Sequence, residues 1–155
     1  MKQKIFLGTD HAGFQLKEEI RKYLENSGID VEDCGAYKLD AHDDYPKFIF
    51  AAAKKVAENK GSMGIVFGGS GQGEAIVANK VKHIRAAVYN SNNLDIVKLS
   101  RTHNDANVLS LGARFLDREK AIEAVRIWLD TDFGNERKHK RRILQIKSIE
   151  KRLYK

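Results

Sequence analysis

The stretch Met63-Gly-Ile-Val-Phe67-Gly68-Gly-Ser-Gly-Gln-Gly73-Glu74 decides the fold. Its first five residues are apolar or glycine and predict a buried strand, because a short apolar run is bounded directly by a turn. Four glycines among residues 68–73 predict a tight turn, and the residues from about Glu74 to Lys80 predict a helix. A buried strand that leads through a turn into a helix is the repeating unit of α/β proteins.

The same alternation continues on both sides of this stretch. Four more apolar segments predict strands, at residues 4–8, 29–34, 85–88 and 108–111. Further helices are expected at residues 16–24 (closed by Gly28), 46–56 (opened by Pro46), 92–101, 117–128 (capped by Asp117) and 136–153. Strands that alternate with helices imply a parallel sheet covered on both faces. The predicted fold is α/β: a three-layer α/β/α sandwich with a Rossmann-like five-stranded parallel sheet and a C-terminal helical arm, in a single domain over residues 1–155.

The composition excludes several classes of protein. The chain has 155 residues, of which 42% are hydrophobic and 32% charged, an ordinary globular balance. No apolar run approaches the roughly 20 residues of a membrane span, and no secretory signal is visible at the N-terminus. A lone Cys34 excludes an internal disulfide framework and suits a reducing compartment, so we expect a cytoplasmic protein with no membrane contact.

The positive charge is concentrated at the C-terminus. Residues 131–155 hold nine Lys or Arg and three Asp or Glu, so this segment carries +6 of the net charge of +7. Arg137 and Arg141 are spaced i, i+4 on the predicted last helix, where two guanidinium groups can converge on one phosphate. The same run resembles a nucleic-acid patch, or it is simply a solvated face, and the sequence leaves these alternatives open. We expect the helix over about 136–155 to contact a partner subunit.

Polar residues follow the predicted strands. In open parallel sheets, ligands bind beyond the carboxyl ends of the strands. The segments that follow strands are residues 9–13, 68–74, 89–92 and 112–114, to which we add residues 101–105 after the fourth helix. We expect all five segments to lie at one edge and to form an enzyme's active site.

The glycine cluster predicts a cradle for an anion or oxyanion. It leaves backbone N–H groups free at a strand-to-helix turn, where the helix dipole favours negative charge. It is neither a P-loop nor a G-x-G-x-x-G fingerprint, because Glu74 stands where Gly or Lys would be needed. Glu74 is either a general base beside these donors or a carboxylate that complements the helix dipole.

The histidines allow more than one interpretation. Asp10-His11 could form a metal site with His42, Asp43 and Asp44, but no second histidine has the spacing of a zinc or iron site, so we expect no metal. His103 is either part of a helix-ending turn or a proton shuttle. We interpret His83 and His139 as surface residues.

Several motifs together resemble a known family. They are Gly8-Thr-Asp10-His11-Ala-Gly13-Phe14, Asp44-Tyr45-Pro46, the glycine loop to Glu74 with Ala78-Asn79-Lys80, and Arg101-Thr-His103-Asn104-Asp-Ala-Asn107. In this order they resemble the ribose-5-phosphate isomerase B family, which also includes allose-6-phosphate isomerase and the galactose-6-phosphate isomerase subunits. The resemblance runs from residue 3 to about residue 150.

The resemblance implies a metal-free and cofactor-free aldose–ketose isomerase that works through a cis-enediolate, with sites built between two subunits of a homodimer or dimer of dimers. One branch of the family uses a Cys as base at the position of Gly68, and this chain matches the other branch, in which the base is Glu74. His103, with Asp10 nearby, would open the sugar ring. The implied substrate-binding residues are Asp10, Asn104 and the loop Gly69, Ser70, Gly71, Gln72 and Gly73 for the sugar, and His11, Arg114, Arg137 and Arg141 for its phosphate.

The expected substrate is ribose 5-phosphate or ribulose 5-phosphate. The nearest alternative is the same chemistry on a six-carbon sugar phosphate, either allose 6-phosphate or galactose 6-phosphate. Two other classes are a nucleotide-binding module that uses the glycine loop and a nucleic-acid binder that uses the basic arm. Glu74 in the cradle argues against the first, and the near-neutral charge of residues 1–130 argues against the second.

Overall fold

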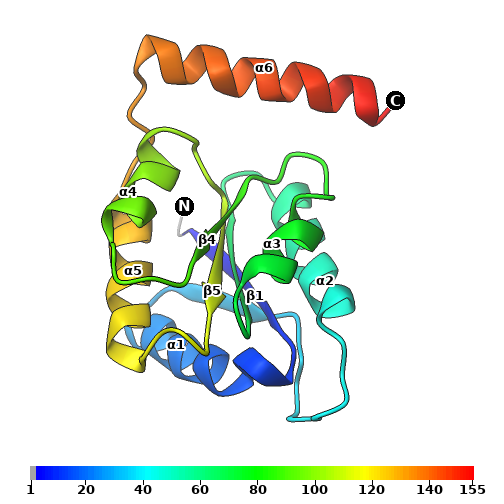
Figure 1. Cartoon of the computed structure of the whole chain (residues 1–155), viewed down its shortest axis with the longest axis vertical. Coiled ribbons are helices and arrows are strands. Elements are labelled where there is room, and N and C mark those ends of the chain that lie inside the picture. Colours follow the sequence, from blue (N-terminus) through cyan, green and yellow to red (C-terminus); the bar gives the residue numbers. More distant parts are fainter. Residues whose placement is uncertain (1–2) are drawn as a thin grey trace.

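Five parallel strands form the centre of the molecule. The computed structural model describes residues 3–155, and Figure 1 shows the chain with its strands between two groups of helices. The strands are β1 (Lys4–Thr9), β2 (Asp30–Asp33), β3 (Met63–Gly68), β4 (Ala86–Tyr89) and β5 (Val108–Gly112), in the spatial order β2-β1-β3-β5-β4. The predicted α/β fold with a five-stranded parallel sheet is confirmed.

Helices cover both faces of this sheet. A short 3-10 turn, η1 (His11–Gly13), precedes α1 (Phe14–Asn26), which lies with α4 (Asp95–Thr102) and α5 (Arg118–Asp130) on one face. The other face carries α2 (Tyr45–Glu58) and α3 (Gln72–Ala78). The last helix, α6 (Arg137–Leu153), lies across one end of the sandwich (Figure 1). No helix in residues 3–155 is long and apolar enough to cross a membrane.

The strand sequences explain this layering. Successive side chains of a strand point to opposite faces. Ile65 and Phe67 therefore pack under α1 and α5, whereas Val66 between them packs under α2. All six residues of β3 are buried, as expected for the central strand of a parallel sheet.

Local signals place the helix ends. Pro46 stands in the first turn of α2, where its missing N–H costs no hydrogen bond. The Asp117 carboxylate caps α5 by accepting a hydrogen bond from Lys120 N at 2.8 Å. Gly28 follows the end of α1 with a φ of 74°, which a residue with a side chain adopts at a cost.

The α6 helix packs across the amino ends of β4 and β5. His139 and Ile143 are buried beneath it, and the Tyr154 hydroxyl donates to the Lys80 carbonyl at 2.6 Å. Glu150 accepts a hydrogen bond from His83 N at 2.6 Å. The helix therefore contacts its own subunit along one face. The interpretation of His139 as a surface residue is wrong, because its ring lies on this packed face.

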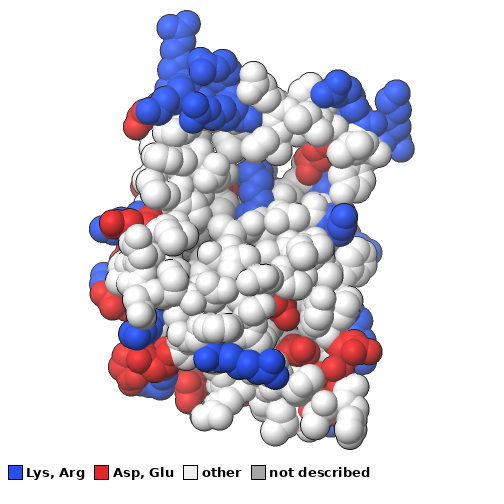
Figure 2. Space-filling view, in the orientation of Figure 1, with Lys and Arg blue, Asp and Glu red and all other residues white. Residues whose placement is uncertain are grey.

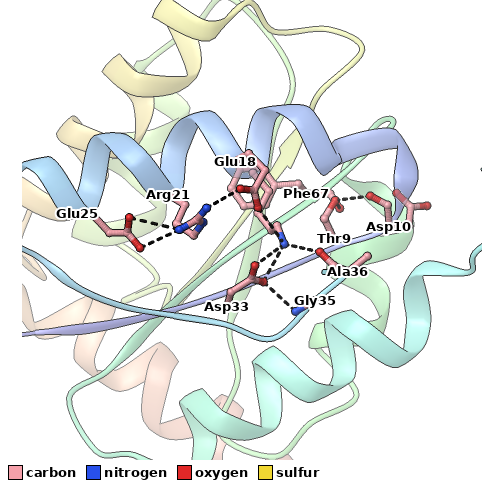
Figure 3. Close-up of polar contacts among 10 residues, drawn as sticks. Thr9, Asp10, Glu18, Arg21, Glu25, Asp33, Gly35, Ala36 and Phe67 are labelled. Atoms are coloured by element: carbon pink, nitrogen blue, oxygen red, sulfur yellow. Dashed lines mark hydrogen bonds and ion pairs between the residues drawn. The ribbon is translucent and has the colours of Figure 1, made fainter. Parts of the chain in front are cut away.

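A buried lysine ties the segment after β2 to the end of β1. Lys17 is completely buried, and its ammonium donates to both Asp33 carboxylate oxygens, at 2.8 and 2.7 Å, and to the Ala36 carbonyl. The Asp33 carboxylate also accepts from Gly35 N at 2.9 Å (Figure 3). The backbones of Gly35 and Ala36 in turn pair with Thr9, each at 2.8 Å. This network holds the chain immediately before Asp10.

Candidate active site

Two loops at the carboxyl ends of neighbouring strands bring Asp10 and Glu74 close to each other. Asp10 follows β1 and is 6% exposed, and its carboxylate accepts a hydrogen bond from Ala12 N at 2.9 Å. Glu74 is 4% exposed in the first turn of α3, beyond β3. Since β1 and β3 are hydrogen-bonded neighbours, the two carboxyl groups share one edge of the sheet.

Glu74 is held where it is poorly solvated. Burial raises the pKa of its carboxyl group, and the negative charge of Asp10 raises it further. The backbone N–H groups of Glu74 and Gly71 oppose this shift, because they stabilise the ionised form. A buried carboxyl group with a raised pKa is better suited to accept and return a proton than one with an ordinary pKa.

The glycine loop presents its N–H groups rather than its carbonyls. The Ser70 carbonyl accepts from Asn90 Nδ2 at 2.9 Å, and the Gly71 carbonyl accepts from the Ser110 hydroxyl at 2.6 Å. No acceptor within residues 3–155 takes the N–H groups of Ser70 or Gly73. Gly71 has a φ of 81°, and this left-handed conformation turns the chain into α3. These donors are free for an anionic oxygen.

Two side chains border this loop. The Arg114 guanidinium, which follows β5, lies over Gly69, and the Tyr45 hydroxyl lies over Gly73. A side chain at either glycine would collide with these groups. Arg114 therefore places a positive charge beside the loop.

His11 is paired with Asp43 from the loop before α2. Asp43 Oδ1 lies 2.8 Å from His11 Nδ1 and accepts from His11 N at 2.9 Å. This pairing is the main cause that raises the pKa of His11, and the charges of Asp10 and Asp43 add to it.

The potential ligand atoms of Asp10, His11 and Asp43 all lie within 4.8 Å of one another. Such a group could approach a metal ion, but His11 Nδ1 and one oxygen of each carboxylate already have protein partners. A cation bound at His11 Nδ1 would compete with the Asp43 contact.

His103 and Asn104 lie at the opposite edge of the sheet. His103 ends α4, and Asn107, just beyond, pairs with Arg85 and Gly64 at the starts of β4 and β3. The expectation that residues 101–105 join the other segments is wrong within one chain, because a helix that follows a parallel strand returns to the amino edge. Strands of five or six residues separate the two groups, a distance of about 17–20 Å.

At this amino edge His103 stacks on His139. Their ring centroids are 4.0 Å apart, with an interplanar angle of 18°. Burial lowers the pKa of His139, and the neighbouring His103, Lys138 and Arg142 lower it further, although Glu136 opposes them. The stacked pair forms a compact group of titratable side chains beside Asn104.

The basic residues of α6 fall on two sides of the helix. Lys and Arg side chains gather over α6 in Figure 2. Arg137 and Arg141 line a hollow on the outer side, together with Lys140, Leu144, Gln145 and Ser148. By contrast, Lys138 and Arg142 are close enough to affect the pKa of His139.

Three site features escaped sequence reasoning. From the sequence, Asp43 is only a possible metal ligand, Tyr45 is only part of a motif, and His139 is only a surface residue. Asp43 lies 32 residues from His11 along the chain, so no local spacing indicates their pairing. The motif Asp44-Tyr45-Pro46 was the available signal that this loop belongs to the site.

The fold and the carboxyl-edge site define an α/β enzyme that places the Glu74 carboxylate at the same edge of the sheet as a set of free backbone N–H donors and a histidine paired with an aspartate. Comparison with known proteins identifies the family to which this enzyme belongs. The sequence profile of the family described as Ribose/Galactose Isomerase matches residues 5–146. The chain belongs to this family, and it is an isomerase of the intramolecular oxidoreductase class.

Relatives of known name and structure agree with this assignment. Ribose-5-phosphate isomerase B of Mycolicibacterium paratuberculosis is 43% identical over 140 residues, which cover 90% of this chain and 87% of the relative. The structure of ribose-5-phosphate isomerase B from Clostridium thermocellum has a TM-score of 0.91 at 40% identity and covers 97% of this chain and 99% of that chain. The Mycoplasma genitalium enzyme, solved with bound ribulose-5-phosphate, has a TM-score of 0.92 at 39% identity over 97% of this chain and 98% of that chain.

Proposed function

We propose that this protein interconverts ribose 5-phosphate and ribulose 5-phosphate through a cis-enediolate, with Glu74 as the base. The relatives named above support the substrate, because one of them holds ribulose-5-phosphate in its structure. The observation that carries the proposal is the position of the Glu74 carboxylate, buried at the start of α3 beside the free N–H groups of the glycine loop.

The chemistry requires one base and one set of fixed donors. In the open-chain aldose, Glu74 takes the proton from C2, and negative charge develops on the C1 oxygen. Backbone N–H groups of the loop stabilise this charge without reorganising, and loss of one such donor typically costs about 3 kcal/mol. Glu74 then returns the proton to C1 while the proton of the C2 hydroxyl moves to the C1 oxygen. The product is the ketose, and Glu74 is again ionised.

The proposed site is shared between two copies of the chain. One copy supplies Glu74, Asp10, His11, Arg114 and the loop Gly69, Ser70, Gly71, Gln72 and Gly73. A second copy supplies His103 and Asn104 from its amino edge. The separation of about 17–20 Å within one chain supports this arrangement, because one pentose phosphate cannot span it. In a two-fold dimer, each copy completes the other's site, and a dimer of dimers would contain the same shared sites.

Ring opening and phosphate binding complete the proposal. His103 of the second copy and Asp10 of the first would supply the acid–base pair that opens the furanose. His11 and Arg114 would bind the phosphate from one side, and basic residues of α6 would bind it from the other. Arg137 and Arg141, which the family resemblance implies and which line one hollow on the outer side of α6, are our candidates for this role. We place the enzyme in the cytoplasm, because the free, buried Cys34 needs no oxidising compartment.

The test is isomerase activity of the purified chain in EDTA, on ribose 5-phosphate and allose 6-phosphate side by side. We expect turnover of the pentose at the higher kcat/KM, with no metal or cofactor added. Glu74→Gln should lower kcat by at least about a hundredfold while inorganic phosphate still binds. Near-normal turnover by this variant would exclude Glu74 as the base, and a preference for the hexose would change the substrate but not the chemistry.

A further inference from the structure

The His11 side chain has one buried anionic partner. The Asp43 side chain is only 4% exposed, whereas the His11 side chain is 33% exposed. Asp43 Oδ1 accepts from both the backbone N–H and Nδ1 of His11. Because Nδ1 faces Asp43, Nε2 is the ring nitrogen left for a ligand. Two contacts from one carboxylate oxygen fix the ring's position as well as its tautomer.

Among residues 3–155, no other positively charged side chain pairs with Asp43. Its second carboxylate oxygen is buried without a hydrogen-bond partner, and within residues 3–155 its only ion-pair partner is His11. A buried carboxylate without a counter-charge is costly. The arrangement is therefore favourable when His11 is an imidazolium and unfavourable when the ring is neutral.

The charged groups near His11 also favour its protonated form. The charged groups that affect it are Asp10, its neighbour in the chain, and Asp43, from the loop before α2. Both are negative, and together with the hydrogen bond they raise the pKa of His11. A sugar phosphate carries between one and two negative charges near neutral pH, so a histidine held in the cationic form binds it more tightly than a neutral ring does.

We propose that Asp43 is a positioning residue that orients the His11 ring and keeps it cationic, so that Nε2–H of His11 donates to the phosphate of the substrate. This inference rests on the proposed function for the identity of the ligand. It adds a specific role for Asp43, which acts through His11 and not on the reacting carbons. The pairing also joins the loop before α2 to the segment that follows β1.

Two variants separate this role from a general effect on the loop. Asp43→Asn keeps the shape of the side chain and removes its charge. Asp40→Asn is the matched control, because Asp40 is an exposed acid of the same loop whose carboxylate contacts only His42 N. Ring ¹⁵N resonances of His11 are titrated by NMR, the dissociation constant for inorganic phosphate is measured, and kcat and KM for ribose 5-phosphate are followed between pH 6 and 8.

We expect D43N to lower the pKa of His11 and to weaken phosphate binding by about tenfold or more. KM should rise by a similar factor, and more steeply as the pH increases, with a smaller change in kcat. In a His11→Gln background, D43N should have little further effect. The control D40N should match the wild type.

The inference is overturned if D43N leaves the His11 titration and the phosphate affinity at their wild-type values. It is also overturned if wild-type His11 is neutral at pH 7, a result that does not require the variant to fold. The phosphate and NMR measurements do not depend on isomerase activity. A wild-type chain that isomerises no sugar phosphate would therefore contradict the proposed function, while these two measurements still decide the role of Asp43.

Discussion

The carboxylate of Glu74 occupies the space that a side chain at position 68 would need. A Cβ atom built on Gly68 would overlap the Glu74 carboxyl group. The resemblance noted in the sequence includes a family branch with a Cys base at this position, and this chain has glycine there. The geometry gives a physical reason why one chain would not use both: a side chain at position 68 and this placement of Glu74 exclude each other.

Gly68→Ala should therefore displace the Glu74 carboxylate and lower kcat. A displacement of about 1 Å costs on the order of a hundredfold in rate, and we expect a loss of this size. Steady-state kinetics of G68A, E74Q and the double variant would measure it. Because both changes act on the same carboxylate, the double variant should be little worse than E74Q alone. Additive losses would show that Gly68 matters for another reason.

The raised pKa of Glu74 predicts a pH-dependent effect on stability. The folded protein favours the protonated carboxyl, so the stability contributed by Glu74 is full below its ordinary pKa of about 4.3 and is lost as the pH rises through the raised value. Glu74→Gln removes this loss. The Tm of E74Q should exceed that of the wild type at pH 8, and the difference should shrink towards pH 4.

Thermal unfolding followed by circular dichroism at several pH values tests this prediction. Glu58→Gln on the exposed surface of α2 is the control and should show no comparable difference. A lower Tm for E74Q at pH 8 would mean that the ionised carboxylate stabilises the fold.

Two pairs of cations on α6 can be compared directly. Lys138 and Arg142 act on His139, which stacks on His103, whereas Arg137 and Arg141 line the outer hollow. We expect R137A/R141A to raise KM for the sugar phosphate about tenfold or more, with a smaller effect from K138A/R142A. Both double variants remove two positive charges, so each controls for the other. The reverse order would contradict the assignment of Arg137 and Arg141 and would favour Lys138 and Arg142.

We predict that Lys17 stabilises the folded protein and so holds the segment before Asp10 in place. Replacing it by Met would leave Asp33 without its ammonium partner and the Ala36 carbonyl without its donor. Removing one partner of a buried ion pair costs about 3 kcal/mol, and we expect a loss of this order in the free energy of unfolding in urea. Lys22→Met, on the exposed side of α1, should change it by less than about 0.5 kcal/mol. A K17M variant as stable as the wild type would show that the network contributes little.

Most of the fold follows from the sequence because apolar periodicity dictates it. The strands and helices appear where apolar runs and helical spacing predict them, and Asp117 caps α5 as expected. Glu74 lies at the carboxyl edge because the glycine loop that precedes it follows β3 directly. The prediction for His103 is wrong within one chain, because His103 follows a helix that returns the chain to the other edge.

The remaining errors concern contacts between distant segments. His139 stands in a run of charged residues and looks solvated, yet it stacks on His103, 36 positions earlier. The pairing of Asp43 with His11 is likewise a property of the folded chain. The spacing of residues within one segment cannot predict either of these contacts, because each joins two segments that are far apart in the sequence.

The shared site is tested most directly by mixing two inactive variants. Glu74→Gln retains the half-site with His103, and His103→Ala retains the half-site with Glu74. If the site is built from two copies, half of the dimers in an equal mixture are hybrids with one intact site each, so activity should return to about a quarter of the wild-type value. If the mixture, after subunit exchange confirmed by mass spectrometry, stays as inactive as its two components, the two half-sites do not combine between copies and the proposed active site is wrong.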